Sequence, residues 1–453
     1  MDWLKNPGTM VPMLALATTA CMRNGEGRGV RSTASLGFII ALAGVLCGCD
    51  AGSKSTLGEP RTGDSEPMGA AGSAPIGSAA PSSVCAFAGS AELGAASADG
   101  SIAVAASHPF VAYGGRVDCA GASGPVLGFV GGSVHVRFRG TGLDVRLKDY
   151  GAGTPATTNY YDVTVDGGEP TLLEVSPAQE RYSLASGLSD GEHQLELFKR
   201  VEAAPGGSTG AGKAEVLGFV LHGSELLPAL RPERRLEFVG DSITCGYGNE
   251  LETTDPDSFH YTSRASNGHK AYGAVTAALL SAQYSAVAYS GRGMSRSFGG
   301  GAGQILPEMY LNSVPEDAAA AAWDPSQYVP DAVVINLGTN DFSTTGVDRA
   351  LFVQNYTDFL TTLRGYYPKA ALVAAIGPML SDYYPPGEKA WTNAQADVQA
   401  AVDARVQAGD QNVHFVAFAP QSAPYGEDWH PTLSTHRKMA DQLSAKLKGI
   451  LGW

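Results

Sequence analysis

The chain has 453 residues, enough for two or three domains, and 44% of them are hydrophobic, as in an ordinary globular protein. Its formal net charge is −14, which argues against nucleic acid and anionic membrane surfaces as partners. A neutral substrate such as a sugar is compatible with this charge.

The N-terminal segment has the pattern of an export signal. Arginines precede an apolar stretch at residues 36–46, which is shorter than the roughly 20 residues that span a bilayer but fits the core of a signal peptide. The sequence Leu-Cys-Gly-Cys at residues 46–49 resembles a bacterial lipobox, whose last cysteine is lipidated after cleavage. We therefore predict residues 1–49 as a signal, with Met22 as an alternative start. Cys49 is the predicted lipid anchor to the cell envelope, and secretion without an anchor is the alternative.

Residues 50–84 consist mostly of Ala, Gly, Ser and Pro and cannot bury a core, so we predict a flexible linker. Beyond it, Cys85 and Cys119 either form a disulfide in an oxidising compartment or stay as unpaired thiols. Cys245 is expected to be a small buried packing residue. The chain has no CxxC or His-rich spacing typical of a metal site, and we expect neither a metal nor a cofactor.

Residues 85–230 carry strand patterns and little sign of helix. Apolar and polar residues alternate with period two in short segments, at residues 134–139, 143–147, 161–165 and 194–198. Turn sequences such as Asp-Gly-Gly at residues 166–168 separate them. We predict an all-β sandwich domain. Two interpretations of its role are open, a sugar-binding surface and a packing domain, and we favour the second.

From residue 231 the pattern changes to strands that alternate with helices. The expected strands are residues 236–239, 285–289, 332–337, 371–376 and 413–417. The expected helices are residues 271–282, 350–364, 393–407 and 435–450. Such alternation predicts a parallel sheet covered by helices on both faces, and we assign residues 231–453 to one α/β domain. Ligands of such sheets bind at the carboxyl ends of the strands.

A serine, an amide side chain and a histidine stand at the edges of these elements. Ser242 follows the first expected strand, Asn340 follows the third, and His430 precedes the last helix. A serine hydroxyl is a weak nucleophile until a base removes its proton, and His430 is the best candidate for that base. The amide of Asn340 and backbone N–H groups would stabilise the oxyanion. The pattern predicts a serine hydrolase.

Four short segments of the α/β domain resemble the sequence blocks of the SGNH (GDSL) hydrolases. Gly-Asp-Ser-Ile at residues 240–243 resembles block I, and Gly-Thr-Asn-Asp at residues 338–341 resembles block III. Asp-Trp-His-Pro at residues 428–431 resembles block V, and residues 288–293 lie where block II supplies a glycine. The resemblance implies a nucleophile in block I and a base in block V.

The same resemblance implies an oxyanion hole built from blocks I, II and III. Its expected donors are the backbone N–H of Ser242, the backbone N–H of Gly293 and the side-chain amide of Asn340. Gly291 is the alternative for the glycine.

The group that orients His430 is open. SGNH enzymes usually place an aspartate three residues before the histidine, but that position holds Glu427, and Asp428 lies two residues before. We predict Asp428 as the third catalytic residue, with Glu427 as the alternative. A Ser-His dyad oriented by a backbone carbonyl is a further alternative. Trp429 is expected either to stack on a sugar ring of the substrate or to fill the core beside His430.

Longer matches narrow the resemblance to carbohydrate esterase family 2. They are Gly-Asp-Ser-Ile-Thr-Cys-Gly-Tyr-Gly at residues 240–248, Tyr-Ser-Gly-Arg-Gly at residues 289–293, and residues 428–431. This resemblance implies a jelly-roll sandwich joined to an SGNH domain, which removes acetyl groups from acetylated polysaccharide or oligosaccharide such as xylan or glucomannan. A short-chain or lipid-directed GDSL esterase or lipase is the alternative. Gly-x-Ser-x-Gly also occurs at residues 187–191 and 206–210, in turn-like stretches, and is interpreted as a chance match.

Overall fold

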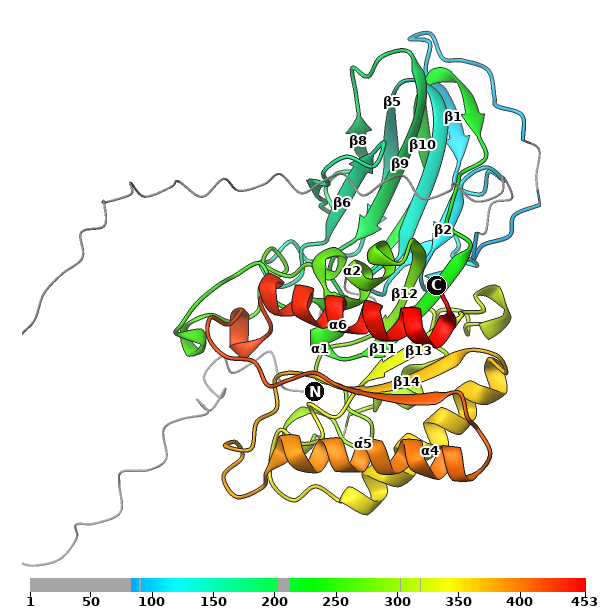
Figure 1. Ribbon diagram of the computed structural model, residues 1–453. Helices are drawn as coiled ribbons and strands as arrows, with labels where there is room; N and C mark the ends of the chain where they lie inside the picture. Colours follow the sequence, from blue (N-terminus) through cyan, green and yellow to red (C-terminus); the bar gives the residue numbers. More distant parts are fainter. Residues whose placement is uncertain (1–82, 89–90, 203–211, 302, 318) are drawn as a thin grey trace, which may run out of the picture. The chain divides into compact units, whose positions relative to one another are not determined.

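The computed structural model describes residues 83–88, 91–202, 212–301, 303–317 and 319–453. The predicted signal, Cys49 and nearly all of the predicted linker lie outside the described residues. An antiparallel β-domain comes first along the described chain and a parallel α/β domain follows it, in the order that the sequence predicts (Figure 1).

Within the described residues, the β-domain is a 10-stranded antiparallel sheet. Its strands are β1 (Ile102–Ala105), β2 (Ala112–Gly114), β3 (Val117–Asp118), β4 (Val126–Leu127), β5 (Ser133–Asp149), β6 (Tyr160–Val165), β7 (Thr171–Glu174), β8 (Arg181–Ala185), β9 (Gly191–Lys199) and β10 (Ala214–Leu227). Their order is β3-β4-β10-β5-β9-β6-β7, with β1 paired to β10 and with β2 and β8 paired to β5. Alternate residues of β5 and β9, such as Val134, Val136, Leu195 and Leu197, are fully buried in its core.

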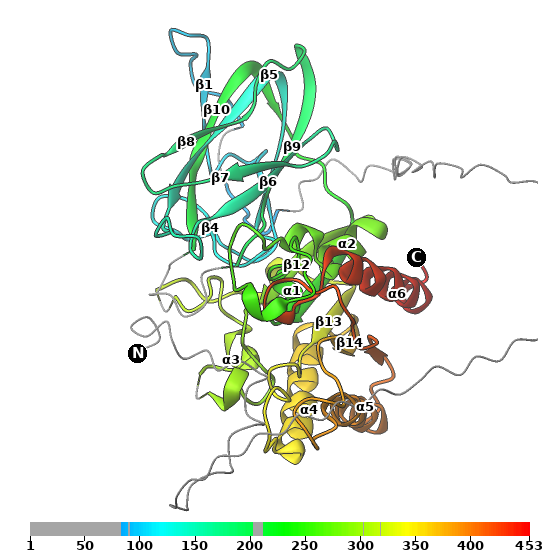
Figure 2. The same cartoon turned by 90° about the vertical axis from the view of Figure 1, so that its left-hand side faces the viewer.

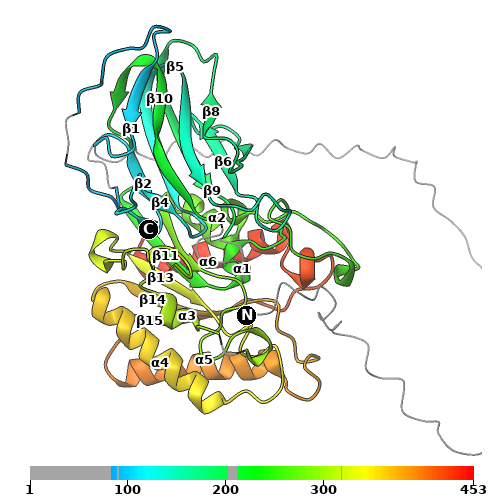
Figure 3. The same ribbon diagram turned by 180° about the vertical axis from the view of Figure 1, so that it is seen from behind.

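Strand β5 takes the place of two predicted strands. The sequence predicts separate strands at residues 134–139 and 143–147, but the structure has one continuous strand that runs beside β10 (Figure 3). Gly140, between the two predicted segments, faces Gly223 of β10, and a Cβ on Gly140 would lie 2.4 Å from the Gly223 Cα. The glycine therefore permits a close approach of two strands instead of ending one.

One disulfide ties the start of the described chain to the segment after β3. Cys85 and Cys119 are bonded, with their Cα atoms 5.5 Å apart. The structure thus selects the disulfide from the two possibilities that the sequence leaves open. Cys245 is a buried free cysteine, as predicted.

The α/β domain holds a parallel sheet that is 5-stranded in the part of the chain described. Its strands are β11 (Arg234–Gly240), β12 (Ala282–Ala288), β13 (Ala332–Asn336), β14 (Ala371–Ile376) and β15 (Val413–Ala417). They follow the order β12-β11-β13-β14-β15, so β11 and β13 are neighbours. The segments that follow these two strands therefore start from the same edge of the sheet.

Helices cover both faces of this sheet. They are α1 (Ser242–Cys245), α2 (Tyr272–Leu279), α3 (Leu306–Met309), α4 (Arg349–Tyr366), α5 (Ala390–Gln407) and α6 (Leu433–Leu451). Helices α2 and α6 pack together on one face, while α4 and α5 pack together on the other (Figures 1 and 2). Among the described residues, no helix combines the length and the apolar character needed to cross a membrane.

The predicted helix at residues 271–282 is shorter in the structure. Helix α2 ends at Leu279, and strand β12 begins at Ala282, before the predicted start of the strand at residue 285. Ser281 between them has a φ of 50°, in the left-handed region, so the chain cannot continue as a helix there. The alanine-rich sequence alone carries no sign of this turn.

A buried ionic cluster joins the two domains. Arg116, from the β-domain, donates to the Glu237 carboxylate on β11 at 3.1 Å and to the Tyr310 carbonyl at 2.8 Å. The Tyr310 hydroxyl also donates to Glu237. The guanidinium lies 4.4 Å from the ring centroid of Trp323. Both Arg116 and Glu237 are fully buried, so each charge depends on the other for compensation.

Candidate active site

Ser242 lies at the turn between β11 and α1. The Asp241 side chain caps α1 by accepting the Ile243 N–H at 3.0 Å. Gly240 makes the turn tight, since a Cβ there would lie 1.9 Å from the Thr244 Oγ1. The strand, the glycine and the cap together fix Ser242 at the carboxyl edge of the sheet, in a site where it is 7% exposed.

His430 is placed against this serine by the segment before α6. Its Nε2 lies 2.7 Å from the Ser242 Oγ. Its Nδ1 lies 2.9 Å from the backbone carbonyl of Glu427. A carbonyl only accepts, so Nδ1 carries the proton and Nε2 is free to accept one from the serine hydroxyl.

The environment of His430 keeps its imidazole neutral. The residue is 8% exposed, and burial lowers its pKa to about 4, although the hydrogen bond with the Glu427 carbonyl acts in the opposite direction. The Tyr247 ring stacks on the imidazole, with the ring centroids 3.9 Å apart and the planes 18° from parallel. A neutral imidazole with an accepting Nε2 is the state that a general base requires.

The structure does not bring Asp428, the predicted third catalytic residue, onto the imidazole. The Asp428 carboxylate accepts the Tyr247 hydroxyl at 2.6 Å, lies 2.8 Å from the Nδ1 of His260, and accepts the Tyr261 N–H at 3.1 Å. Asp428 and the next residue, Trp429, have φ values of 47° and 66°, which turn the chain sharply before His430. This turn presents the backbone, and not the Asp428 side chain, to His430.

The alternative third residue, Glu427, also directs its carboxylate elsewhere. Its oxygens accept the Thr262 N–H at 2.8 Å and the Thr262 hydroxyl at 2.7 Å. Only its backbone carbonyl contacts the His430 side chain. The observed geometry is therefore that of the dyad alternative.

The predicted oxyanion donors come from loops that are linked to the nucleophile turn. Asn340 Nδ2 donates to the Arg292 carbonyl at 2.8 Å and to the Asp241 carboxylate at 3.3 Å. Within the described chain, the backbone N–H groups of Ser242 and Gly293 have no hydrogen-bond partner. Both backbone N–H groups can therefore donate to an oxygen of a bound ligand.

The loop after Gly293 is held in place by the carboxylate of Asp341. Asp341 accepts the Met294 N–H at 2.8 Å, the Ser295 N–H at 2.7 Å and the Arg296 N–H at 2.9 Å. A Cβ on Gly293 would lie 2.0 Å from the Arg296 carbonyl and 2.5 Å from the Asp341 carboxylate. The sequence suggests only a turn or helix cap for Asp341, because nothing local indicates a partner more than 40 residues away.

Trp429 and the Gly-x-Ser-x-Gly matches complete the set of predicted positions. Trp429 is partly exposed, donates from Nε1 to Asp257 at 2.9 Å, and packs its ring against Tyr425 at 4.9 Å. The match at residues 187–191 leads into strand β9 and not into a helix, as expected for a chance match. The match at residues 206–210 lies outside the described residues.

Comparison with known proteins divides the chain as the structure does. Residues 113–229 match the family described as carbohydrate esterase 2 N-terminal, and residues 238–438 match the GDSL-like lipase/acylhydrolase family. The chain is 37% identical over 353 residues to the cellulase/esterase CelE of Acetivibrio thermocellus; the match covers 76% of this chain but 40% of that protein. It is 29% identical over 356 residues to an acetylxylan esterase/glucomannan deacetylase of Cellvibrio japonicus, covering 77% of this chain and 91% of that protein.

Solved structures of family two carbohydrate esterases are also similar to this chain. A family two carbohydrate esterase from Clostridium thermocellum in complex with cellohexaose is 37% identical, with a TM-score of 0.68; the match covers 76% of this chain and 99% of that one. A family two carbohydrate esterase from Cellvibrio japonicus is 27% identical, with a TM-score of 0.67, covering 78% of this chain and 98% of that one.

Proposed function

The chain belongs to carbohydrate esterase family 2, and we propose that it is a serine esterase that removes O-acetyl groups from xylan- or glucomannan-type polysaccharide. The contact of 2.7 Å between the Ser242 Oγ and the His430 Nε2 carries the proposal. The substrate class is supported by the relatives named as acetylxylan esterases and glucomannan deacetylases.

In the first half of the proposed reaction, the Ser242 Oγ attacks the carbonyl carbon of the acetyl ester. His430 Nε2 takes the hydroxyl proton, and the Glu427 carbonyl stabilises the resulting imidazolium through Nδ1–H. The N–H groups of Ser242 and Gly293 stabilise the oxyanion, and the amide of Asn340 joins them when the substrate oxygen replaces one of its two present acceptors, Asp241 and Arg292. The bond between the carbonyl carbon and the sugar oxygen then breaks, and His430 gives the proton to that oxygen, which leaves an acetyl-serine and a free sugar hydroxyl.

In the second half, a water molecule attacks the acetyl-serine. His430 removes a proton from this water as it adds to the carbonyl carbon, and the same donors stabilise the second oxyanion. Collapse releases acetate and returns the proton to Ser242. Trp429, partly exposed next to His430 along the chain, is our candidate for stacking against a sugar ring.

The geometry predicts that neither neighbouring carboxylate is essential. We expect Asp428→Asn and Glu427→Gln each to lower kcat by no more than about tenfold, because the backbone carbonyl orients His430 and remains in both variants. The measurement is kcat on an acetyl ester for both variants beside the parent protein. A loss of about 10³-fold or more in one variant would identify that side chain as a third catalytic residue.

The pH dependence follows from the buried imidazole. Below its pKa His430 is protonated and cannot accept the serine proton, so activity is lost as the pH falls. Because burial lowers the pKa of His430 to about 4, we expect the acid limb of kcat/KM to lie near pH 4 and not near 6.5. Far-UV circular dichroism at each pH checks that the protein stays folded. An acid limb near 6.5 in folded protein would contradict the neutral, buried histidine.

Substrate preference distinguishes the proposal from a lipid-directed esterase. We expect p-nitrophenyl acetate to be hydrolysed faster than the butyrate and far faster than long-chain esters, and acetate to be released from acetylated xylan and glucomannan. Rates at equal ester concentration, with released acetate quantified for the polymers, make the comparison. A preference for chains longer than butyryl would favour the lipid-directed alternative and contradict the deacetylase.

We further propose that the protein acts outside the cytoplasm. The lipobox-like sequence ending at Cys49 supports a lipid-anchored protein of the cell envelope, and the Cys85–Cys119 disulfide supports an oxidising compartment. The mass of the mature N-terminal peptide tests this, because a diacylated Cys49 and a plain signal cleavage give different products. An intact N-terminus in the native host would contradict export.

A further inference from the structure

The β-domain reaches the candidate active site through the residues that follow strand β9. Arg200 and Glu202 leave the β-domain on the α/β side and are only 3% and 4% exposed. The Glu202 side chain bonds to residues of the α/β domain, and Arg200 bonds both to that domain and to Asp162 of the β-domain. The chain at residues 200–202 therefore lies between the two domains as a bridge.

Glu202 contacts two of the segments that carry the reaction, the nucleophile helix and the oxyanion loop. Its carboxylate accepts the Ser290 N–H at 2.7 Å and also the Ser290 hydroxyl. The Cys245 thiol lies 3.5 Å from the same carboxylate, within donor distance. Cys245 ends helix α1, three residues after Ser242, and Ser290 precedes Gly293 by three residues. One side chain of the β-domain thus links the nucleophile helix to the oxyanion loop.

The burial of Glu202 strengthens its preference for these hydrogen-bond donors. Burial raises the pKa of Glu202 to about 7, although the hydrogen bonds from Ser290 act in the opposite direction. Whether charged or protonated, a buried carboxyl oxygen that loses its donors is left without a hydrogen-bond partner, so Glu202 favours the arrangement in which its donors stay in place. These donors belong to the nucleophile helix and the oxyanion loop. The arrangement that satisfies Glu202 therefore also fixes these two segments relative to each other.

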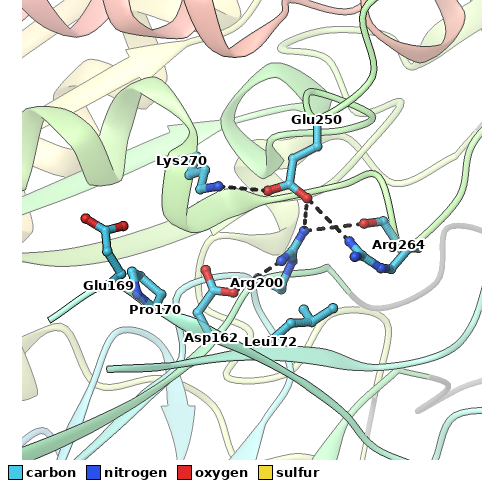
Figure 4. Close-up of a pocket in the computed structure, with 8 residues that line it drawn as sticks. All are labelled: Asp162, Glu169, Pro170, Leu172, Arg200, Glu250, Arg264 and Lys270. Atoms are coloured by element: carbon cyan, nitrogen blue, oxygen red, sulfur yellow. Dashed lines mark hydrogen bonds and ion pairs between the residues drawn. The ribbon is translucent and has the colours of Figure 1, made fainter. Parts of the chain in front are cut away.

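Arg200 contacts a loop of the α/β domain that in turn contacts the segment of His430. Figure 4 shows its guanidinium between Asp162 of the β-domain, at 3.2 Å, and Glu250 of the α/β domain, with the Arg264 carbonyl at 3.3 Å. These side chains line a pocket of about 220 Å³. Thr262 lies in the same loop as Arg264. It donates to the carboxylate of Glu427, and the backbone carbonyl of Glu427 orients His430.

We propose that Glu202 is a positioning residue for the esterase reaction. Its carboxylate holds Ser290 and Cys245 so that the Ser242 hydroxyl and the Gly293 N–H both reach the carbonyl group of the same acetyl ester. The inference rests on the proposed function, since it concerns the geometry of that site. It gives the β-domain a role in the reaction without requiring that domain to bind sugar. A displacement of about 1 Å between a nucleophile and its oxyanion donor costs on the order of 10²-fold in rate.

Substitution of Glu202 tests the proposal, with kcat and KM measured on an acetyl ester. The activity in question is the one that depends on Ser242. We expect Glu202→Ala to lower kcat about 10- to 100-fold, with KM changed less than about threefold, because the donors shift while the sugar contacts remain. Glu202→Gln is expected to stay within about fivefold, since its carbonyl accepts the Ser290 N–H and its amide donates to the Ser290 hydroxyl. Cys245 should react faster with a thiol reagent in Glu202→Ala than in Glu202→Gln.

Lys213→Ala is the matched control. Lys213 of the β-domain bonds to Asp317 of the α/β domain at 2.5 Å, so it also joins the domains, but it contacts neither the nucleophile helix nor the oxyanion loop. We expect this variant to keep kcat within about twofold. If Glu202→Ala does not fold, Ser290→Ala replaces it, with an expected kcat loss of about three- to tenfold from the missing hydroxyl contact.

The outcomes separate the two proposals. A parent protein without acetyl esterase activity, or with activity that survives Ser242→Ala, contradicts the proposed function. With that activity present, parent-like kcat in Glu202→Ala, or in Ser290→Ala where that replaces it, overturns the positioning role. A rise in KM alone, or an equal kcat loss in Lys213→Ala, overturns it as well.

Discussion

Replacing Ser242 with alanine is expected to lower kcat by a factor on the order of 10⁴–10⁶, the loss seen when a serine nucleophile is removed from a serine hydrolase. The His430 Nε2 then has no hydroxyl to activate, and no acetyl-enzyme forms. The remaining rate comes from the oxyanion donors and from water near His430. The measurement is kcat on p-nitrophenyl acetate with sensitivity to at least the lower end of this range.

The fold of this variant should be unaffected, which makes the result interpretable. The Ser242 hydroxyl contacts His430, and alanine fits the space of serine. Thermal unfolding of parent and variant provides the control, with an expected difference of no more than about 1 kcal/mol in unfolding free energy. Near-parent turnover in a folded variant would remove Ser242 from the mechanism.

Gly293→Ala is expected to have the second largest effect, a fall in kcat of about 10²–10³-fold, comparable to the loss of one oxyanion donor. The added Cβ would lie 2.0 Å from the Arg296 carbonyl and 2.5 Å from the Asp341 carboxylate, and neither can withdraw without moving the loop. The loop would shift, and the Gly293 N–H would move away from the oxyanion. Because substrate contacts elsewhere remain, kcat should change much more than KM.

Gly291→Ala separates the two candidate glycines. Gly291 has a φ of 78°, so alanine there costs about 1 kcal/mol of backbone strain, but its Cβ would approach nothing closer than 3.9 Å. We expect a loss of stability with kcat reduced less than about tenfold. If Gly291→Ala loses activity while Gly293→Ala keeps it, the oxyanion donor belongs to Gly291.

The sequence predicts most of the α/β domain because short stretches of residues determine its strands and helices. The strands at residues 371–376 and 413–417 have the predicted bounds, since apolar runs flanked by turns determine them. Ser242 and His430 were also identified from short motifs, and the structure brings them together. Their approach needs only the common edge at which parallel strands end.

Contacts across large sequence separations were not predictable in this way. Asp341 holds the loop after Gly293, and Glu202 reaches Ser290 across 88 residues. An Asp two residues before a histidine looks like a triad member, but the left-handed turn at Asp428 directs its side chain elsewhere. Side-chain direction at such a turn depends on partners such as Tyr247, which the sequence pattern does not reveal.

The buried pair of Arg116 and Glu237 has a consequence for biosynthesis. Glu237 lies inside the strand next to the nucleophile, and its compensating charge comes from a residue made 121 positions earlier. The β-domain precedes the α/β domain along the chain, so it can present Arg116 before β11 is in place. A chain that began at residue 231 would hold this carboxylate without its cation, a defect worth up to several kcal/mol where the carboxylate stays buried. The β-domain thus serves as an intramolecular template, and expression of residues 231–453 alone should yield aggregated protein.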